Sequence, residues 1–403
     1  MLARMCLCLL LAAFVNAGFG ESSGPNSEGK ARLTRLSLEQ LGNTDVTTVS
    51  KEPTKLNRTP AAIYVITQED IRRSGATSIP EALRLAPGVE VSRIDSHRWS
   101  LGVRGFESNL SRSVLVLIDG RSVYTPLFAG VYWEVQDTLL EDIERIEVIR
   151  GPGGTIWGAN AVNAVINIIT KKASETHGVF ASTRGGSLDQ GFFGFRYGGG
   201  NSKNLDYRVY SKAFSRGPEF HPELQHFDRW RMAQAGFRTD WEPKSRDTLT
   251  LQGDLYNNDA GEKVGILTYS PPATTYLQRD AELSGGNLVG RWQRIINDGS
   301  HLQLQAYYDR TNHYEPSYGE KRDTFDIDFL DHLRLPKRQN VLWGAGGRIS
   351  PSDFIQRTPA IVFNPHVTDK LYSLFAQDEI GVVKDRLWVN HRVKIPAQQL
   401  HRL

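Results

Sequence analysis

The feature that most constrains how this chain can fold is a two-residue alternation of side-chain character after residue 172. A stretch with this period is extended, and its two faces differ in chemistry. In "TLTLQGDLY" one face is apolar and the other is polar. The apolar face carries Leu249, Leu251, Gly253 and Leu255, and the polar face carries Thr248, Thr250, Gln252 and Asp254.

Similar segments, separated by turn residues, recur from residue 172 to residue 389. They include "GVFASTRGG", "LDYRVYSKAFSRG", "MAQAGFRTDWEP", "HLQLQAYYDRTN" and "LYSLFAQDEIGV". Alternating segments of about 10 residues with aromatics near their ends predict a transmembrane antiparallel β-barrel. A soluble β-sandwich or propeller also alternates and is the alternative. The formal net charge of +3 is too balanced to predict nucleic-acid binding.

The first 17 residues predict a signal peptide. Arg4 supplies a positive charge, the run Met5–Val15 is apolar, and "VNA" ending at Ala17 fits a signal-peptidase site. The run is too short for a membrane anchor, which needs about 20 residues. Both cysteines, Cys6 and Cys8, lie inside this signal, so we expect the mature chain to form no disulfide and no cysteine-ligated metal site.

Residues 18–54 are polar and predict an exported N-terminal arm, and the segment that follows, residues 55–171, predicts a small α/β domain. In this domain "AAIYVIT" predicts a strand, and a helix follows with Thr67 as its N-cap and Gly75 as its terminator. A second helix is expected after Ser78, where Glu81 would complete a capping box, and Pro87-Gly88 would end it.

A glycine-rich stretch, "IRGPGGTIWGANAVNAVINIITKK", follows a predicted strand at residues 143–149 and raises the question of phosphate binding. Gly153 and Gly158 have the spacing of a phosphate loop, yet Ala159-Asn160 stand where Lys and then Ser or Thr belong. The next segment is β-branched and predicts a strand, so no helix N-terminus follows that could hold a phosphate. The stretch therefore predicts a tight turn between strands.

The same stretch resembles the end of the plug domain of TonB-dependent outer-membrane receptors. The matching residues are Arg150, Gly151, Pro152, Gly158, Ala161, Ile166, Asn167 and Ile168, and Ala164 stands where the family usually has Gly. Two shorter stretches resemble other plug elements and follow in the family's order. They are "LGVRGF", which contains Arg104 and Gly105, and the hairpin "VLVLIDGRSVY", with Asp119 and Gly120 at a type I′ turn.

This resemblance implies a plug lodged inside a transmembrane barrel of 22 strands and an N-terminal TonB box that binds a TonB-type energy-transducing periplasmic protein. "TDVTTVS" is similar to such a box, and it could add as a strand to the sheet edge of that partner. An ordinary linker is the alternative. The candidate residues of the box are Thr44, Asp45, Val46, Thr47, Thr48 and Val49. The resemblance also implies that Arg104 and Arg150 pair with carboxylates on the inner wall of the barrel.

Arginines and aromatics in the plug loops are the candidate ligand contacts, because they stack on planar ligands and hold anionic ones. A place in the plug core or against the barrel is the alternative. The candidates are Arg93, His97, Arg98, Trp99, Tyr124, Phe128, Tyr132 and Trp133. No ligand spacing predicts a metal site and no G-x-S-x-G elbow predicts a nucleophile. We therefore expect neither enzymatic activity nor a cofactor.

The function that the resemblance implies is energised uptake, through the outer membrane, of a scarce small molecule such as an iron-siderophore, haem or cobalamin. A secreted β-rich hydrolase and a receptor fragment that does not transport are the alternatives. The fragment is considered because 22 strands need about 220 residues, whereas residues 172–389 hold ten or eleven strand candidates. Residues 390–403 turn basic, and we expect them to form an aberrant, frameshifted tail outside the sheet.

Overall fold

A computed structural model describes twelve ranges of the chain. They are residues 45–46, 54–55, 61–105, 114–151, 157, 161–201, 204–222, 226–269, 272–336, 338–358, 364–383 and 387–399. The expected signal peptide, residues 1–17, lies outside these ranges. No helix in the described part of the chain is long and apolar enough to cross a membrane.

The α/β domain is built on a five-stranded sheet with the order β3-β8-β9-β6-β7. Strands β6 and β9 are parallel, and the other neighbours are antiparallel. A separate antiparallel hairpin pairs β4 with β5. The elements are β3 (Ile63–Thr67), α3 (Gln68–Ser74), α4 (Ile79–Leu83), β4 (Val89–Arg93), β5 (Trp99–Val103), β6 (Val114–Ile118), β7 (Arg121–Ser122), η3 (Trp133–Val135), η4 (Leu140–Asp142), β8 (Ile143–Arg150) and β9 (Ala164–Thr170).

The ends of the two helices test the capping predictions. Thr67 caps α3 in a capping box with Asp70, and Gly75 ends the helix in the left-handed conformation at φ 71°, as predicted. The box expected at Ser78 is wrong, because Ser78 makes no side-chain cap bond. Glu81 instead accepts hydrogen bonds from the backbone N–H and the hydroxyl of Thr77, and α4 ends at Leu83, before Pro87.

The predicted turn at Asp119-Gly120 is confirmed, whereas the turn predicted for the glycine-rich stretch is described only at its ends. Asp119 and Gly120 join β6 to β7 with φ of 49° and 82°, the positive pair that a type I′ turn requires. In the glycine-rich stretch, Gly151 has φ 145° and donates a hydrogen bond of 2.8 Å to the carbonyl of Asn163. The segment that follows is strand β9, so no helix begins there. Residues 152–156 and 158–160 lie outside the described ranges.

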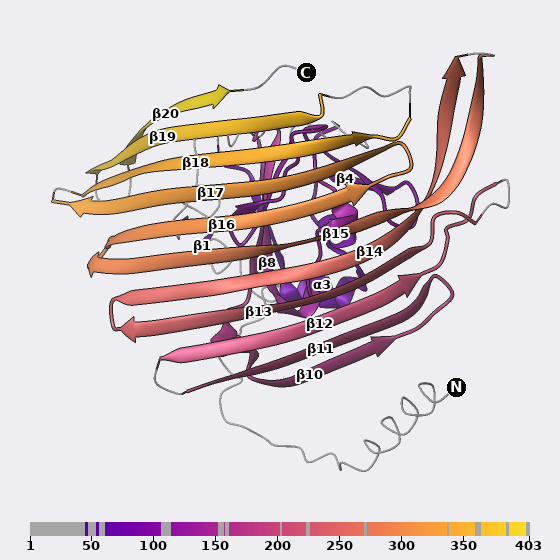
Figure 1. The fold of residues 1–403 in the computed structure, drawn as a ribbon. Coiled ribbons are helices and arrows are strands. Elements are labelled where there is room, and N and C mark those ends of the chain that lie inside the picture. Colours follow the sequence, from indigo (N-terminus) through magenta and orange to yellow (C-terminus); the bar gives the residue numbers. More distant parts are fainter. Residues whose placement is uncertain are drawn as a thin grey trace, which may run out of the picture. The chain divides into compact units, whose positions relative to one another are not determined.

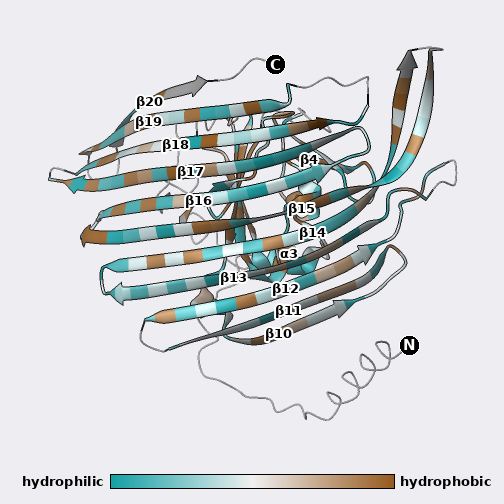
Figure 2. Ribbon diagram, in the orientation of Figure 1, coloured by the Kyte–Doolittle hydropathy of each residue, from teal (hydrophilic) through white to brown (hydrophobic). Residues whose placement is uncertain are grey.

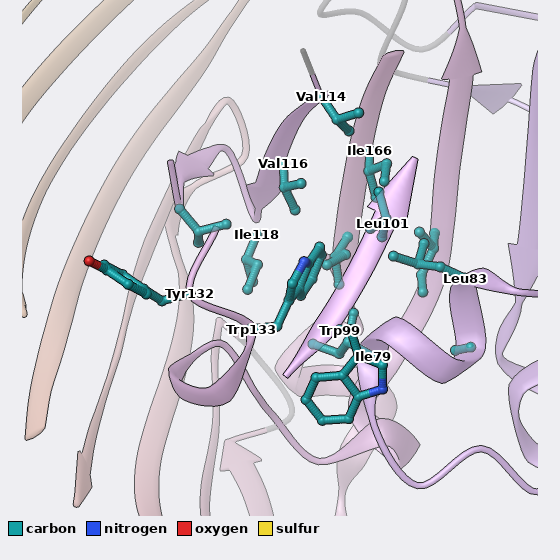
Figure 3. Close-up of a cluster of buried hydrophobic side chains, with 14 of the residues drawn as sticks. Ile79, Leu83, Trp99, Leu101, Val114, Val116, Ile118, Tyr132, Trp133 and Ile166 are labelled. Carbon is teal, nitrogen blue, oxygen red and sulfur yellow. The ribbon is translucent and has the colours of Figure 1, made fainter. Parts of the chain in front are cut away.

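One hydrophobic core holds the helices, the β4–β5 hairpin and the five-stranded sheet together (Figure 3). Ile79 and Leu83 of α4 and Leu101 of β5 are each at most 2% exposed. They pack with Val116 and Ile166 of the central strands. Burial of branched side chains of this size stabilises a fold by about 1.5–3 kcal/mol each. Trp230, Met232 and Tyr256 of the strands that follow belong to the same cluster, so the domain shares its core with them.

An 11-stranded antiparallel sheet follows, in which β10 to β20 pair in chain order (Figure 1). The 3-10 turn η5 (Ala173–Thr176) connects β9 to it. The strands are β10 (Gly178–Arg184), β11 (Asp189–Asn201), β12 (Leu205–Arg216), β13 (Trp230–Lys244), β14 (Asp247–Tyr269), β15 (Pro272–Asn297), β16 (Ser300–Tyr314), β17 (Tyr318–Leu335), β18 (Gln339–Gln356), β19 (His366–Val383) and β20 (Leu387–Gln399). We call the face of this sheet that contacts the α/β domain the inner face, and the opposite one the outer face.

Hydropathy changes back and forth along the strands of the sheet (Figure 2), and the exposure of the side chains shows that its two faces differ as the alternation predicts. On β14, Leu255 of the outer face is 71% exposed, whereas the neighbouring Tyr256 of the inner face is 8% exposed. Further large apolar side chains are exposed on the outer face, among them Leu251, Leu288, Phe325, Ile327 and Leu374. The inner face is thus buried, with polar side chains beside apolar ones such as Tyr256, whereas the outer face exposes large apolar side chains, as the lipid-facing wall of a β-barrel does.

The expected end of the sheet at residue 389 is wrong. Strand β20 continues to Gln399 and pairs with β19 throughout. Val389, Val393 and Ile395 keep the outward apolar positions of the alternation, and the basic residues Arg392 and Lys394 alternate with them. The sequence prediction weighed the charge of these residues and overlooked that Val389, Val393, Ile395 and Ala397 are still apolar at alternate positions, which only His391 interrupts.

The proposed TonB-box segment is described only in part. Asp45–Val46 forms strand β1, which pairs antiparallel with β2 (Thr54–Lys55), and Val46 is buried. Asp45 and Val46 therefore have the β conformation that the composition of the segment predicts. Thr44, Thr47, Thr48 and Val49 lie outside the described residues.

Candidate functional site

The candidate functional site is the buried polar surface on which the α/β domain meets the inner face of the sheet. The domain contributes mainly carboxylates, and strands β11 to β13 contribute mainly cations. Their side chains are almost fully removed from water, and a buried charge of this kind is tolerated only when it is paired. The carboxylates are Asp119, Asp137 and Asp142, and the cations are Arg196, Arg208, Lys212 and Arg238.

Asp119, at the tip of the β6–β7 turn, connects the two parts. Its carboxylate accepts hydrogen bonds from the backbone N–H (2.9 Å) and hydroxyl (2.7 Å) of Thr170 and from Gln252 of β14 (2.8 Å). Arg291 of β15 donates to its backbone carbonyl at 2.6 Å. Burial alone would raise the pKa of Asp119, but the charge of Arg238 and these hydrogen bonds lower it. The carboxylate is therefore held ionised at the interface.

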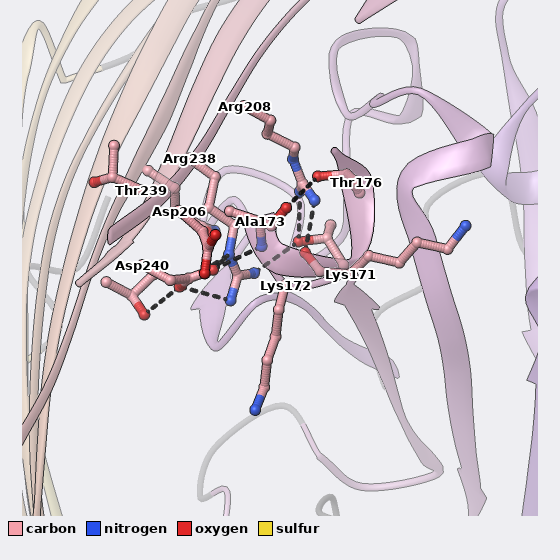
Figure 4. Close-up of polar contacts among 12 residues, drawn as sticks. Lys171, Lys172, Ala173, Thr176, Asp206, Arg208, Arg238, Thr239 and Asp240 are labelled. Atoms are coloured by element: carbon pink, nitrogen blue, oxygen red, sulfur yellow. Dashed lines mark hydrogen bonds and ion pairs between the residues drawn. The ribbon is translucent and has the colours of Figure 1, made fainter. Parts of the chain in front are cut away.

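The connection between the domain and the sheet is fixed by two arginines of the inner face (Figure 4). Arg208 donates to the carbonyl of Lys171 at 2.6 Å. Arg238 pairs with Asp240 at 2.9 Å, and Asp240 accepts from the backbone N–H of Ala173 at 2.8 Å. Arg208 and Arg238 also both donate to the hydroxyl of Thr170 at 3.1 Å. The segment that leads from β9 into β10 is thus anchored to β12 and β13.

Two buried ion pairs hold the middle of the domain. The ammonium of Lys212 pairs with Asp137 and donates to the carbonyl of Thr138 at 3.0 Å. Arg196 pairs with Asp142, which is fully buried. Removing one partner of such a pair leaves an uncompensated charge and costs about 3–5 kcal/mol, so these contacts resist separation of the domain from the sheet.

A stacked aromatic contact marks the end of the domain near the β16–β17 turn. The ring of Tyr132 stacks on His313 of β16 with 4.0 Å between the ring centroids. His313 lies 3.0 Å from the carboxylate of Glu134. The hydroxyl of Tyr132 lies 3.1 Å from that of Tyr318. Burial raises the pKa of Tyr132 well above its usual value, so this hydroxyl stays protonated and serves as a hydrogen-bond donor.

The loop between β4 and β5 makes a third group of contacts. The backbone N–H of Ser96 donates to Asp228 at 2.9 Å, and Arg216 donates to the carbonyl of Ser96 at 3.2 Å. Arg98 pairs with Asp95 at 2.5 Å. His97 is 1% exposed, and burial lowers its pKa, so it is neutral and sits in the interface rather than on an open surface.

The pairing expected for Arg104 and Arg150 is not found among the described residues. Arg104 donates to the carbonyl of Arg150 at 2.7 Å, and Arg150 donates to the carbonyl of Pro87 at 2.9 Å. Both guanidinium groups therefore bind backbone of their own domain. Arg104 also has φ 60°, a conformation that non-glycine residues seldom adopt. The hydrogen bond from its guanidinium to the carbonyl of Arg150 helps to stabilise this conformation.

The candidate ligand contacts do not form one common surface. Trp99 and Trp133 lie in the hydrophobic core, and Trp99 packs edge-to-face on Trp230 of β13 at 5.6 Å between centroids. Phe128 packs edge-to-face on Tyr132 at 4.9 Å. Arg93 pairs with Glu81 and with Glu219. Tyr124 lines a cavity of about 60 Å³ between the domain and strands β16 to β19, which is room for a few water molecules.

The sequence alone did not predict the residues that make the main contacts of the interface. Lys212, Arg208, Arg238 and His313 occupy inward positions of alternating strands, next to outward apolar residues. The sequence did carry a signal that could have identified them, namely a cation at an inward position of a predicted barrel strand. Among the described residues, no three His, Cys, Asp or Glu side chains come together in a way that could hold a metal ion.

Comparison with known proteins agrees with this architecture. Residues 55–165 match the family described as TonB-dependent Receptor Plug Domain. The ferric enterobactin receptor of Pseudomonas aeruginosa is 31% identical over 358 residues, which cover 83% of this chain and 43% of that protein. The vitamin B12 transporter BtuB of Vibrio vulnificus is 33% identical over 150 residues, which cover 37% of this chain and 24% of the transporter. The chain thus spans less than half the length of these two relatives.

A solved structure shows the same fold. The ferripyoverdine receptor of the outer membrane of Pseudomonas aeruginosa superposes with a TM-score of 0.66 at 17% identity, over 89% of this chain and 56% of that chain. The family match covers the α/β domain, and the structural likeness covers the 11-stranded sheet as well. The chain is therefore a TonB-dependent receptor plug domain followed by the strands of part of a receptor β-barrel.

Proposed function

We propose that the protein is an outer-membrane receptor that takes up a scarce small molecule with energy supplied through a TonB-type periplasmic partner. The observation that carries this proposal is the opposite chemistry of the two faces of the sheet. The outer face exposes large apolar side chains, as a lipid-facing barrel wall does. The inner face binds the plug through buried ion pairs such as Lys212–Asp137. A barrel wall with lipid on one side and a plug on the other is the arrangement of outer-membrane transporters whose lumen is closed by a plug.

The names of the relatives support a small-molecule ligand. They describe receptors or transporters for ferric enterobactin, ferripyoverdine and vitamin B12. We propose the same broad class here, an iron-siderophore, haem or cobalamin, without choosing among them. The proposal includes the outer membrane as the location and excludes covalent chemistry on the ligand.

The proposed TonB contact rests on the β conformation of Asp45–Val46. A short strand can add to the sheet edge of another protein, here by exchanging its pairing with β2 for that edge. Proline cannot donate the backbone hydrogen bond that such pairing needs. Val46→Pro is therefore expected to abolish energised uptake without removing the protein from the membrane.

Uptake of radiolabelled ligands tests the proposal. Cells that lack their own receptors would produce the protein, and accumulation of ⁵⁵Fe-enterobactin, ⁵⁵Fe-pyoverdine, ⁵⁵Fe-haem and ⁵⁷Co-cobalamin would be measured with and without a functional TonB. We expect one of these probes to accumulate only when TonB works, and Val46→Pro to prevent it. The proposal would be contradicted if the protein is found in the outer-membrane fraction but the cells accumulate none of the probes.

A further inference from the structure

We propose that a groove on the outer face of the sheet binds one glycerophospholipid, with an acyl chain in the groove and the phosphate at a basic row beside it. This inference rests on the proposed function, because it needs the outer face to lie in a membrane. It goes further than that function, because it assigns a specific binding site for one lipid to the barrel wall. The other lipids around the wall would exchange freely.

The groove has a volume of about 590 Å³ and lies over strands β13 to β16. Clefts of roughly 300–1,000 Å³ are typical of small-molecule sites. Two adjacent rows of residues form it, since residues directly opposite in a sheet share a face. One row carries Trp241, Leu249, Trp292 and Leu304, and the next carries Thr239, Leu251, Gly290 and Ala306.

Small residues open the floor of the groove. Gly290 and Ala306 stand opposite each other, next to the row that holds the two tryptophans. No positive φ requires glycine at position 290, and an added Cβ would meet only the Cδ1 of Leu251, at 4.0 Å. At Gly253 and Gly286 of the same face, by contrast, an added Cβ would collide with the backbone of the next strand. Neither backbone conformation nor a close backbone contact therefore requires glycine at position 290, and its missing side chain leaves space beside Leu251.

The wall of the groove is fixed by polar contacts at one end. The indole N–H of Trp292 donates to Asp247 at 3.0 Å, and Arg294 pairs with the same carboxylate at 3.2 Å. Lys244 stands opposite Asp247 on β13, and Arg246 is exposed in the turn between them. Including the exposed Glu242, this end of the groove carries three cations and two carboxylates. It therefore has an excess of positive charge that suits a phosphate.

The order of these rows matches the order of groups in a phospholipid. Tryptophans of membrane proteins lie at the level of the headgroups. Here Trp241 and Trp292 separate the basic row on one side from the apolar floor at Gly290 on the other. Successive rows of one face are about 7 Å apart, so a phosphate at Lys244 and Arg246 places the first acyl carbons beside the tryptophans and the following ones over Gly290.

Native mass spectrometry of the full chain tests the site. The protein would be reconstituted in phosphatidylcholine vesicles that contain equal amounts of phosphatidylglycerol and dioleoylglycerol, extracted in mild detergent, and weighed with its retained lipids. We expect one retained phospholipid for the wild type and none for Gly290→Leu, which fills the groove. The matched control is Ala235→Leu, on the outer face of β13 opposite Leu255, and it is expected to retain the lipid.

A second variant tests the contact between the lipid phosphate and the basic residues. Lys244→Ala combined with Arg246→Ala is expected to weaken phospholipid retention on the order of 10- to 30-fold, from about 1 kcal/mol for each cation near a lipid headgroup. Retention of dioleoylglycerol in place of phospholipid would overturn the role of the phosphate. Equal retention by wild type and Gly290→Leu would overturn the groove.

Resistance to carbonate extraction shows whether the reconstituted protein has inserted into the vesicles. This measurement separates a failure of the lipid site from a failure of the proposed function. A protein that does not insert into the vesicles overturns both. A protein that inserts but keeps no phospholipid, or loses it equally in Ala235→Leu and Gly290→Leu, overturns the lipid site alone and leaves the receptor proposal standing.

Discussion

The buried pair of Lys212 and Asp137 gives the sharpest prediction on how the plug is held. Lys212 belongs to the sheet and Asp137 to the plug, and their side chains are only 2% and 5% exposed. In Lys212→Met, Asp137 loses its cation and keeps the hydrogen bond of 2.9 Å from the backbone N–H of Thr138. An uncompensated buried charge costs about 3–5 kcal/mol. Separation of the plug from the sheet is therefore expected to become on the order of 100- to 5,000-fold more frequent.

Hydrogen exchange of the plug amides in the membrane-embedded protein measures this change, because exchange in β6 and β9 requires the domain to open. The double variant Asp137→Asn with Lys212→Met removes both charges and is expected to recover most of the protection. Arg229→Ala is the control, since Arg229 pairs with Asp280 at an exposed site, where such a pair contributes about 1 kcal/mol or less. Unchanged exchange in Lys212→Met, or no recovery in the double variant, would refute the reasoning.

Three further predictions concern the plug. Thr67→Ala removes the cap of α3 and should lower the free energy of unfolding, measured by urea denaturation, by about 1 kcal/mol; no change would contradict the capping box. Gly120→Ala should cost more than Gly75→Ala in the same assay, because both have positive φ but only at Gly120 would a Cβ lie 2.9 Å from Gln305. Because the pKa of Asp119 is lowered, its stabilisation is complete above the unfolded value of about 3.9 and is lost as the pH falls through the lower folded value. Asp119→Asn should remove that part of the acid sensitivity, and an unchanged acid titration would argue against it.

Local rules predicted the elements whose cause is local. The strands of the sheet follow from alternation, the end of α3 follows from Gly75, and the β6–β7 turn follows from Asp119-Gly120. Each depends on a few neighbouring residues and on backbone conformation. The box at Ser78 failed because Thr77, one residue earlier, offers Glu81 two donors. Such competition between neighbouring caps is not visible in the sequence.

The interface could be predicted only in outline. Plug residues such as Trp99 and Trp133 are chemically suited to ligands, but the fold uses them as core. Arg104 and Arg150 were assigned to the barrel wall by resemblance, and they bind plug carbonyls instead. The pairing of Lys212 with Asp137 joins residues far apart in sequence, and it depends on the register of β12 against the plug. Sequence alone shows that inward cations exist and leaves their partners open.

The central claim is that one face of the sheet contacts lipid while the other holds the plug, and adjacent residues test it directly. Spin labels would be placed singly at Leu251 and Gln252 of β14 and at Leu288 and Val289 of β15, using a chain without Cys6 and Cys8. The accessibility of each label to membrane-dissolved oxygen would then be measured by electron paramagnetic resonance. The account predicts high oxygen accessibility at positions 251 and 288 and low accessibility at 252 and 289. Equal accessibility at neighbouring positions, or the reverse pattern, would contradict it.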